Sequence, residues 1–178
     1  MDPFERFTRH PLDEVLVGEG VLTRERAAEL VASARQTGVP LATVLLESAT
    51  MTAWDLAKTI ATQYQMPVHP LSGYRFAPEL LEGVEAGIFH RHHIVPLGVF
   101  GRTRTFAVFE PPTRELIDEL TGAYGSSLFF FVAEGPEIER VLREQVKVLD
   151  VEKDGGWAKL FDAGDEKVQG APAVAKKG

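Results

Sequence analysis

The sequence predicts an α+β protein: an N-terminal four-helix module (two repeated helical hairpins), followed by a small three-stranded sheet with packed helices. Two observations lead to this prediction. A 24-residue pattern occurs twice near the N-terminus, and helix-like and strand-like segments alternate after it. They divide the chain into an N-terminal arm (1–10), a repeated helical-hairpin module (11–66), an α+β subdomain (67–149) and a flexible tail (150–178).

The repeated pattern spans residues 11–34 and 40–63, and each copy is predicted to form two helices. Apolar residues recur in each copy at i, i+3 and i+4, the spacing of one helical face. Gly20 stands where the first hairpin turns, and Thr23 and its counterpart Thr52 are suitable N-caps for the second helix of each hairpin. One hairpin cannot bury its apolar face alone, so we expect the two hairpins to pack against each other.

The second half of the chain predicts a sheet with helices packed on it. A short strand or extended link is expected at residues 65–71. The elements expected after it are a helix at 76–93, strands at 92–100 and 104–112 around a turn, a helix at 113–125, a strand at 126–134, and a last helix opened by Gly135.

Composition excludes several classes of function. The net charge of −7 argues against a nucleic-acid partner, because such proteins neutralise phosphates with a basic surface. With no cysteine, the chain cannot form disulfides, thiolate metal sites or thiol nucleophiles. No signal peptide and no apolar run of about 20 residues is visible, so we expect a cytoplasmic protein without membrane insertion. No cofactor is expected.

The order of these elements resembles the N-terminal domain of the ATPases that drive type II secretion and type IV pilus assembly. The resemblance runs from about Leu12 to Val146, with Glu110 and Pro111 in place of that family's Asp-Pro pair. It implies a domain that ties a motor to a membrane-platform partner. The motor itself needs a GxxxxGK[ST] phosphate loop, and the sequence has none.

One branch of this family binds cyclic di-GMP through two copies of the motif RLGxxLLxxGLLxxxxLxxxLxxQ. The arginine positions of the motif hold Pro11 and Pro40 here, and its first glycine positions hold Asp13 and Ala42. A carboxylate beside a doubly anionic ligand is repulsive. The groove residues that the resemblance still allows, together with arginines that could substitute, are Leu12, Leu16, Gly20, Leu41, Leu45, Gln63, Arg9 and Arg35.

Two further segments stand out. Trp157, Leu160 and Phe161 fall at i, i+3 and i+4 in an otherwise polar tail, which is typical of a helix that docks in a groove, either on a partner or on its own domain. His90 and His93 could face one way on a helix, but two histidines without a third ligand favour a basic helix end over a metal site.

The sequence therefore predicts no catalytic residues and no enzyme. It favours a non-catalytic adaptor or regulatory domain that binds a protein partner, with a cyclic di-GMP sensor as the alternative. A third possibility is a scaffold whose partner recognises only the α+β half. A cation from Arg9, Arg35 or Arg75 in the groove between the hairpins would favour the sensor, whereas an apolar or acidic groove would favour the adaptor.

Overall fold

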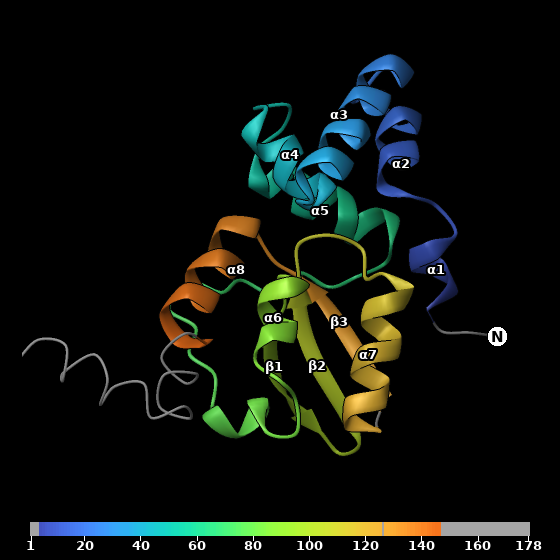
Figure 1. Cartoon of the computed structure of the whole chain (residues 1–178). Coiled ribbons are helices and arrows are strands. Elements are labelled where there is room, and N and C mark those ends of the chain that lie inside the picture. Colours follow the sequence, from blue (N-terminus) through green and yellow to red (C-terminus); the bar gives the residue numbers. More distant parts are fainter. Residues whose placement is uncertain (1–3, 126, 147–178) are drawn as a thin grey trace, which may run out of the picture.

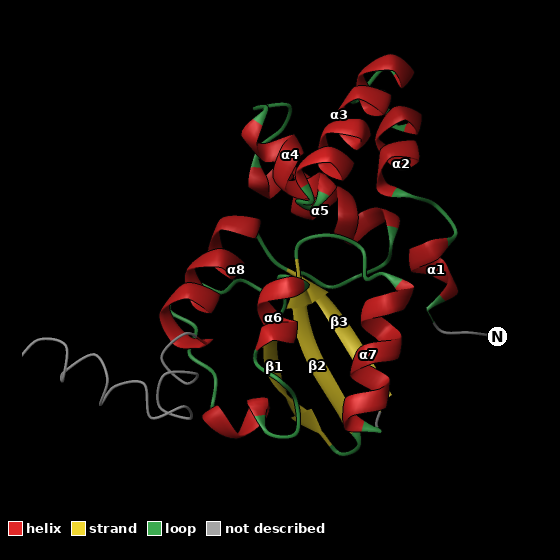
Figure 2. Ribbon diagram, in the orientation of Figure 1, coloured by secondary structure: helices red, strands yellow, loops and turns green. Residues whose placement is uncertain are grey.

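The computed structural model describes residues 4–125 and 127–146. In Figure 1 the helical hairpins form one layer above a sheet that has helices packed on it. The helices are α1 (Glu5–Thr8), α2 (Leu12–Gly18), α3 (Arg24–Thr37), α4 (Leu41–Glu47), α5 (Ala53–Gln63), the 3₁₀ turn η1 (Pro78–Leu81), α6 (Gly87–Arg91), α7 (Arg114–Tyr124), α8 (Gly135–Val141) and the π-helical turn η2 (Leu142–Val146). The strands are β1 (Val95–Phe100), β2 (Thr103–Val108) and β3 (Ser127–Val132). The predicted α+β class, with two hairpins and a three-stranded sheet, is confirmed (Figure 2).

The two hairpins repeat each other in backbone geometry as well as in sequence. Pro11 and Pro40 stand at the N-caps of α2 and α4 with φ/ψ of −57°/148° and −56°/146°. The predicted caps are also confirmed. The Thr23 hydroxyl accepts a hydrogen bond from the Arg26 N–H, and the Thr52 hydroxyl accepts one from the Asp55 N–H. Proline fixes φ near the value that an entry to a helix needs, so it suits both positions.

The turn inside each hairpin needs a left-handed residue. Gly20 fills this position in the first hairpin with φ 74°, and Ala49 fills it in the second with φ 51°. The turn hydrogen bonds are also equivalent, since the Gly20 N–H donates to Val17 and the Ala49 N–H donates to Leu46. A side chain in this conformation carries a steric cost that glycine avoids.

We therefore expect Ala49→Gly to raise the free energy of unfolding by about 0.5 kcal/mol, because relief of strain outweighs the added freedom of the unfolded chain. The matched substitution Gly20→Ala should lower it by about 1 kcal/mol. Urea denaturation of both variants checks this. A destabilised Ala49→Gly variant would show that the alanine is not strained.

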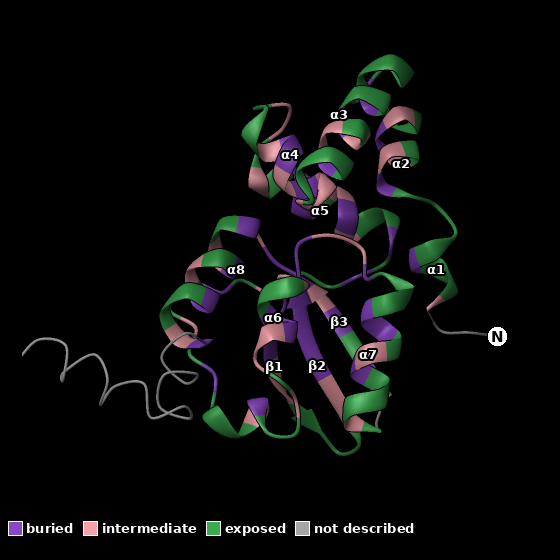
Figure 3. Cartoon of the chain, viewed as in Figure 1, coloured by how far each residue is buried: buried purple, intermediate pink, exposed green. Residues whose placement is uncertain are grey.

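The sheet has the order β1-β2-β3, with β1 antiparallel and β3 parallel to β2. Figure 1 shows α6 and α7 in front of it. Tyr124 of α7 marks the covered face, because Arg104 stacks over its ring at 3.9 Å and the Phe106 ring lies 6.0 Å away. Most of β2 is buried (Figure 3), as expected for the central strand.

The predicted helix at 76–93 is wrong as a single element. It is divided into η1 and α6, with Gly83 between them at φ 85°. A left-handed residue cannot continue an α-helix, so the segment changes direction there. The link at 65–71 begins in a turn, with Gln65 at φ 52°, and the pair Val68–Val132 then forms an isolated parallel bridge to the end of β3.

The hairpins and the sheet share one hydrophobic core. The Tyr64 hydroxyl donates to the His10 carbonyl at 2.6 Å, which ties the end of α5 to the chain before α2. The segment predicted as an N-terminal arm contains α1, and the buried Phe7 on it meets the Phe130 ring of β3 at 6.0 Å. Leu46 of the second hairpin lies close to Gly135 at the start of α8.

Candidate functional site

A groove of about 520 Å³ lies between α3 of the first hairpin and α4 of the second. It has the size of a ligand or side-chain pocket. The α3 residues that line it lie on one helical face, because they recur every three or four positions. The lining residues are Arg26, Glu29, Leu30, Ser33, Thr37, Val39, Val44, Glu47 and Ser48.

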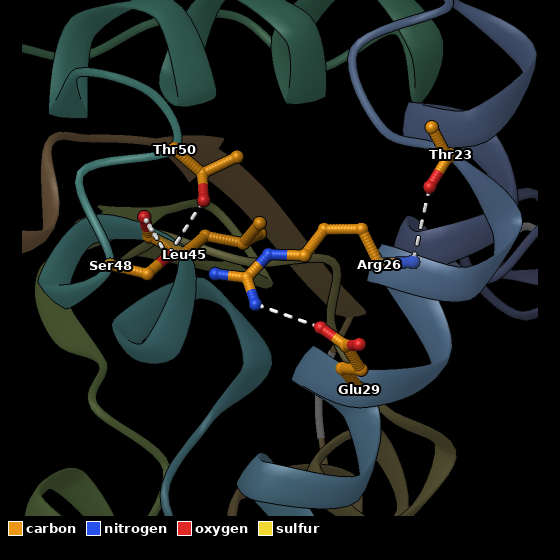
Figure 4. Close-up of polar contacts among 6 residues, drawn as sticks. All are labelled: Thr23, Arg26, Glu29, Leu45, Ser48 and Thr50. Atoms are coloured by element: carbon orange, nitrogen blue, oxygen red, sulfur yellow. Dashed lines mark hydrogen bonds and ion pairs between the residues drawn. The ribbon is translucent and has the colours of Figure 1, made fainter.

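Arg26 is the cation of this groove. Its side chain extends from α3 toward the end of α4, and its guanidinium donates to the Glu29 carboxylate at 2.9 Å (Figure 4). On the opposite side the Ser48 hydroxyl donates to the Leu45 carbonyl at 3.1 Å and lies 2.7 Å from the Thr50 hydroxyl. Arg26 on one wall and Ser48 on the other thus already have partners within the protein.

The charge of the groove is negative. Of its lining residues, Arg26 is positive, while Glu29 and Glu47 are negative. Glu29 neutralises Arg26, so Glu47 adds an exposed carboxylate at the rim. The apolar lining below it consists of the buried Leu30 and Val44, which are 3% and 8% exposed, and the half-buried Val39. The combination suits an apolar side chain with a positive neighbour better than a phosphate group.

The leucines predicted for a ligand groove lie largely in the core. Leu16 and Leu45 are both 0% exposed, and Leu12 is also buried. Leu41 is half-buried against the same core. In this structure these side chains hold the hairpins together, and the groove between α3 and α4 is lined by other residues.

The remaining predicted groove residues are dispersed. Gly20 is exposed in the first turn, and the Gln63 amide donates to the Glu19 carboxylate at 2.7 Å, linking the end of α5 to the end of α2. Arg9 lies 3.9 Å from Glu5 on α1. The exposed Arg35 lies on the last turn of α3.

Arg75 belongs to the α+β half, since the next residue, Phe76, donates its N–H to Gln145 of η2. None of the three arginines predicted to fill the groove (Arg9, Arg35 and Arg75) is among the residues that line it. Trp157, Leu160 and Phe161 lie outside the described residues.

The HRHH segment meets carboxylates. Arg91 pairs with Glu119 of α7, and His92 Nε2 lies 2.7 Å from the second oxygen of the same carboxylate. The hydrogen bond from His92, aided by Arg91, lowers the pKa of Glu119. His93 pairs with Glu139 of α8. Within the described ranges no group of three potential metal ligands is arranged to hold an ion.

Glu110, at the family's Asp-Pro position, connects the sheet to the second hairpin. Its carboxylate interacts with the backbone of Ala42 in the first turn of α4, where Pro40 provides no side-chain cap. Burial raises the pKa of this carboxyl group, while the Ala42 N–H and the nearby His93 oppose the shift. Glu110 therefore brings a carboxylate of the α+β subdomain to the first turn of α4, where the hairpin itself provides no side-chain cap.

The raised pKa predicts a pH effect. A carboxyl group whose pKa is higher in the folded than in the unfolded protein prefers to be protonated in the folded state. It therefore adds to stability below its unfolded pKa, and this contribution is lost as pH rises through its folded pKa. We expect Glu110→Gln to raise the melting temperature at pH 7, because the amide keeps an acceptor for Ala42 without a buried charge. The gain should shrink as pH falls below the usual carboxyl range. Calorimetry between pH 4 and pH 8 measures the change in melting temperature, and Glu82→Gln, at an exposed residue, is the control. A difference in melting temperature that grows as pH falls would contradict a raised pKa for Glu110.

Sequence reasoning missed Arg26, Ser33 and Thr37 as groove residues. The signal was present, because residues 26, 30, 33 and 37 follow the spacing of one helical face. That spacing shows that they share a face, but not that α4 lies opposite it. Among the residues that the structure describes, no helix has both the length and the apolar character to cross a bilayer.

Comparisons with known proteins agree with this architecture. Residues 64–146 match the MshEN domain family, so the match covers the α+β half and not the hairpin repeats. The chain also resembles the solved structure of MshE with cyclic di-GMP (“cdg”), with 19% identity and a TM-score of 0.58 over 76% of this chain and 99% of that one. None of the curated proteins compared with the chain matches it.

Two crystal forms of the N-terminal domain of XpsE are similar as well. One has 20% identity and a TM-score of 0.51 over 76% of this chain and 93% of that chain. The other has 19% identity and a TM-score of 0.58 over 80% and 95%. At these identities the likeness establishes the fold. The resemblance to the N-terminal domains of secretion and pilus ATPases is thereby confirmed.

Proposed function

We propose that this chain, with its MshEN match and the fold of ATPase N-terminal domains, is a non-catalytic adaptor or regulatory domain that binds a protein partner in the groove between α3 and α4. The partner would be part of secretion-type or pilus-type machinery or a regulator of it. The observation that carries the proposal is the composition of the groove, which has apolar surface, two carboxylates and one arginine that is already paired.

A protein side chain is a better occupant of this groove than a nucleotide. Binding a doubly anionic ligand would require Arg26 to leave Glu29, and both glutamates would then face the phosphates. A partner that places an apolar side chain over Leu30 and Val44 can bind without breaking the ion pair between Arg26 and Glu29. A basic residue beside it would gain from Glu47.

The alternative is a cyclic di-GMP sensor, favoured by the fold shared with MshE, whose solved structure contains that ligand. The motif's arginine positions oppose it, because Pro11 and Pro40 provide no charged group there. A sensor that bound its ligand in this groove would have to use Arg26, the one arginine among the lining residues, as its phosphate ligand. This makes Arg26→Ala the discriminating substitution.

The test has two arms. Isothermal titration with cyclic di-GMP is expected to give no heat, and micromolar binding lost in Arg26→Ala would replace the adaptor by the sensor. In the second arm, the purified cytoplasmic domain of the platform protein of the same organism's secretion or pilus machinery is titrated. Ser33→Trp, which fills the groove, should abolish binding, whereas Ala32→Trp on an exposed face of α3 should not. Equal binding by both variants would remove the groove from the proposal.

A further inference from the structure

The sheet face opposite α7 carries an exposed aromatic surface. Gly98, Thr105 and Phe129 are opposite one another across β1, β2 and β3 and therefore share this face. Phe100 lies on it as well, because its ring comes within 3.7 Å of the position that a Cβ on Gly98 would take. Phe100 is 73% exposed and Phe129 is 39% exposed. The half-buried Phe131 meets Phe129 with ring centres 5.1 Å apart.

Only one end of this face is covered by the described part of the chain. Tyr74 lies there, since its hydroxyl donates to the Pro96 and Leu97 carbonyls of β1. Its ring meets His69, which in turn meets Phe131. The other end keeps the exposed aromatic side chains of Phe100 and Phe129 in contact with water, a costly arrangement that usually marks a binding surface.

The described chain ends beside the covered part. The Gln145 amide donates to the Tyr74 carbonyl at 2.8 Å and accepts from the Phe76 N–H at 3.1 Å, so the last described residue, Val146, directly follows the residue that contacts Tyr74. Residues 147–156 separate Val146 from Trp157. Ten residues can span up to about 33 Å, whereas a six-residue strand is about 20 Å long, so Trp157 can reach every point of the face.

We propose that the segment from Trp157 to Phe161 of the same chain covers this face, with Trp157, Leu160 and Phe161 placed against Phe100 and Phe129. The segment offers what the surface lacks: three large apolar side chains within five residues, in a stretch of chain otherwise rich in charge and glycine. Attachment next to the surface favours this occupant over a free one, because a short connection gives a high effective concentration. Neither Phe100 nor Phe129 lines the groove between α3 and α4.

Fluorescence tests the proposal directly. The chain has two tryptophans, and Trp54 is 53% exposed on α5. In Trp54→Phe, Trp157 is the sole tryptophan of the full-length chain. Its emission should be shifted to the blue and protected from quenching by acrylamide. Phe100→Ser, at a residue whose exposure makes loss of the fold unexpected, should remove both effects, whereas Val21→Ser on the first hairpin should leave them unchanged.

Each other result overturns the proposal. Emission typical of a solvated indole, unaffected by Phe100→Ser, would show that the segment does not reach the face. Protection that increases with protein concentration would assign the face to a second copy of the chain. Protection that survives Phe100→Ser and Phe129→Ser together, with circular dichroism unchanged, would place Trp157 on another surface.

Discussion

Leu45→Ala is expected to lower the free energy of unfolding by about 3 kcal/mol, because it removes a leucine that is wholly enclosed and leaves a cavity. Leu45 lies on α4 at the position that Leu16 occupies on α2, and both are 0% exposed. The two hairpins and the sheet share one core. Leu16→Ala should therefore destabilise the same cooperative transition by a comparable amount, measured by urea denaturation.

The control for this pair is Val21→Ala. Val21 is an apolar residue of the first hairpin that is 42% exposed, so its truncation should change stability by less than about 0.5 kcal/mol. Loss of less than 1 kcal/mol in Leu45→Ala would mean that the second hairpin is packed more loosely than its burial implies. Two separate transitions in Leu45→Ala would mean that the hairpins do not unfold with the sheet.

Gly135→Ala is expected to cost about 2 kcal/mol through overpacking at the point where hairpin two meets the sheet. A Cβ on Gly135 would lie 3.0 Å from Phe109 Cδ2 and 3.3 Å from Leu46 Cδ1. Leu46 is only partly buried and can turn aside, but the Phe109 ring is 4% exposed and packs against the His93 ring, with ring centres 5.7 Å apart. Thermal unfolding followed by circular dichroism measures the loss.

The matched control lies on α7. Gly122→Ala adds the same methyl group where nothing lies within 4 Å, and in an exposed helix the better propensity of alanine should stabilise by up to about 1 kcal/mol. The two substitutions are therefore expected to have opposite signs. A neutral Gly135→Ala would show that the contact between Leu46 and α8 adjusts easily.

The parts of the fold that follow from local chemistry could be predicted. The caps at Thr23 and Thr52 and the glycine turn at Gly20 depend on residues within one turn of the chain, and each lies where expected. The division of residues 76–93 depends on the conformation of Gly83, which a helix-like pattern does not reveal. Helical periodicity alone was too weak a guide there.

The residues of the candidate site were harder to predict from the sequence than the caps and turns. Leu16 and Leu45 fit a ligand motif and a helical core equally well, and burial is what distinguishes the two roles. Arg26 could be placed on a face of α3, but not opposite α4, because the crossing of two helices depends on the whole core. Glu110 shows the same limit, since its contact with α4 joins residues that are distant in sequence.

The hydrogen bonds between the segment at 71–76 and α8–η2 have a consequence for the order of folding during synthesis. The Leu71 N–H donates to Glu137 and the Phe76 N–H donates to Gln145, across 66 and 69 residues. Each hairpin, in contrast, closes over a short stretch of chain. On the ribosome the local contacts of the hairpins become available as soon as both hairpins have emerged, while the sheet and the shared core must wait for β3 and α8. Until then the backbone groups of Leu71, Tyr74 and Phe76 lack their partners on α8 and η2, so a nascent chain stalled before α8 would leave this side of the domain incomplete.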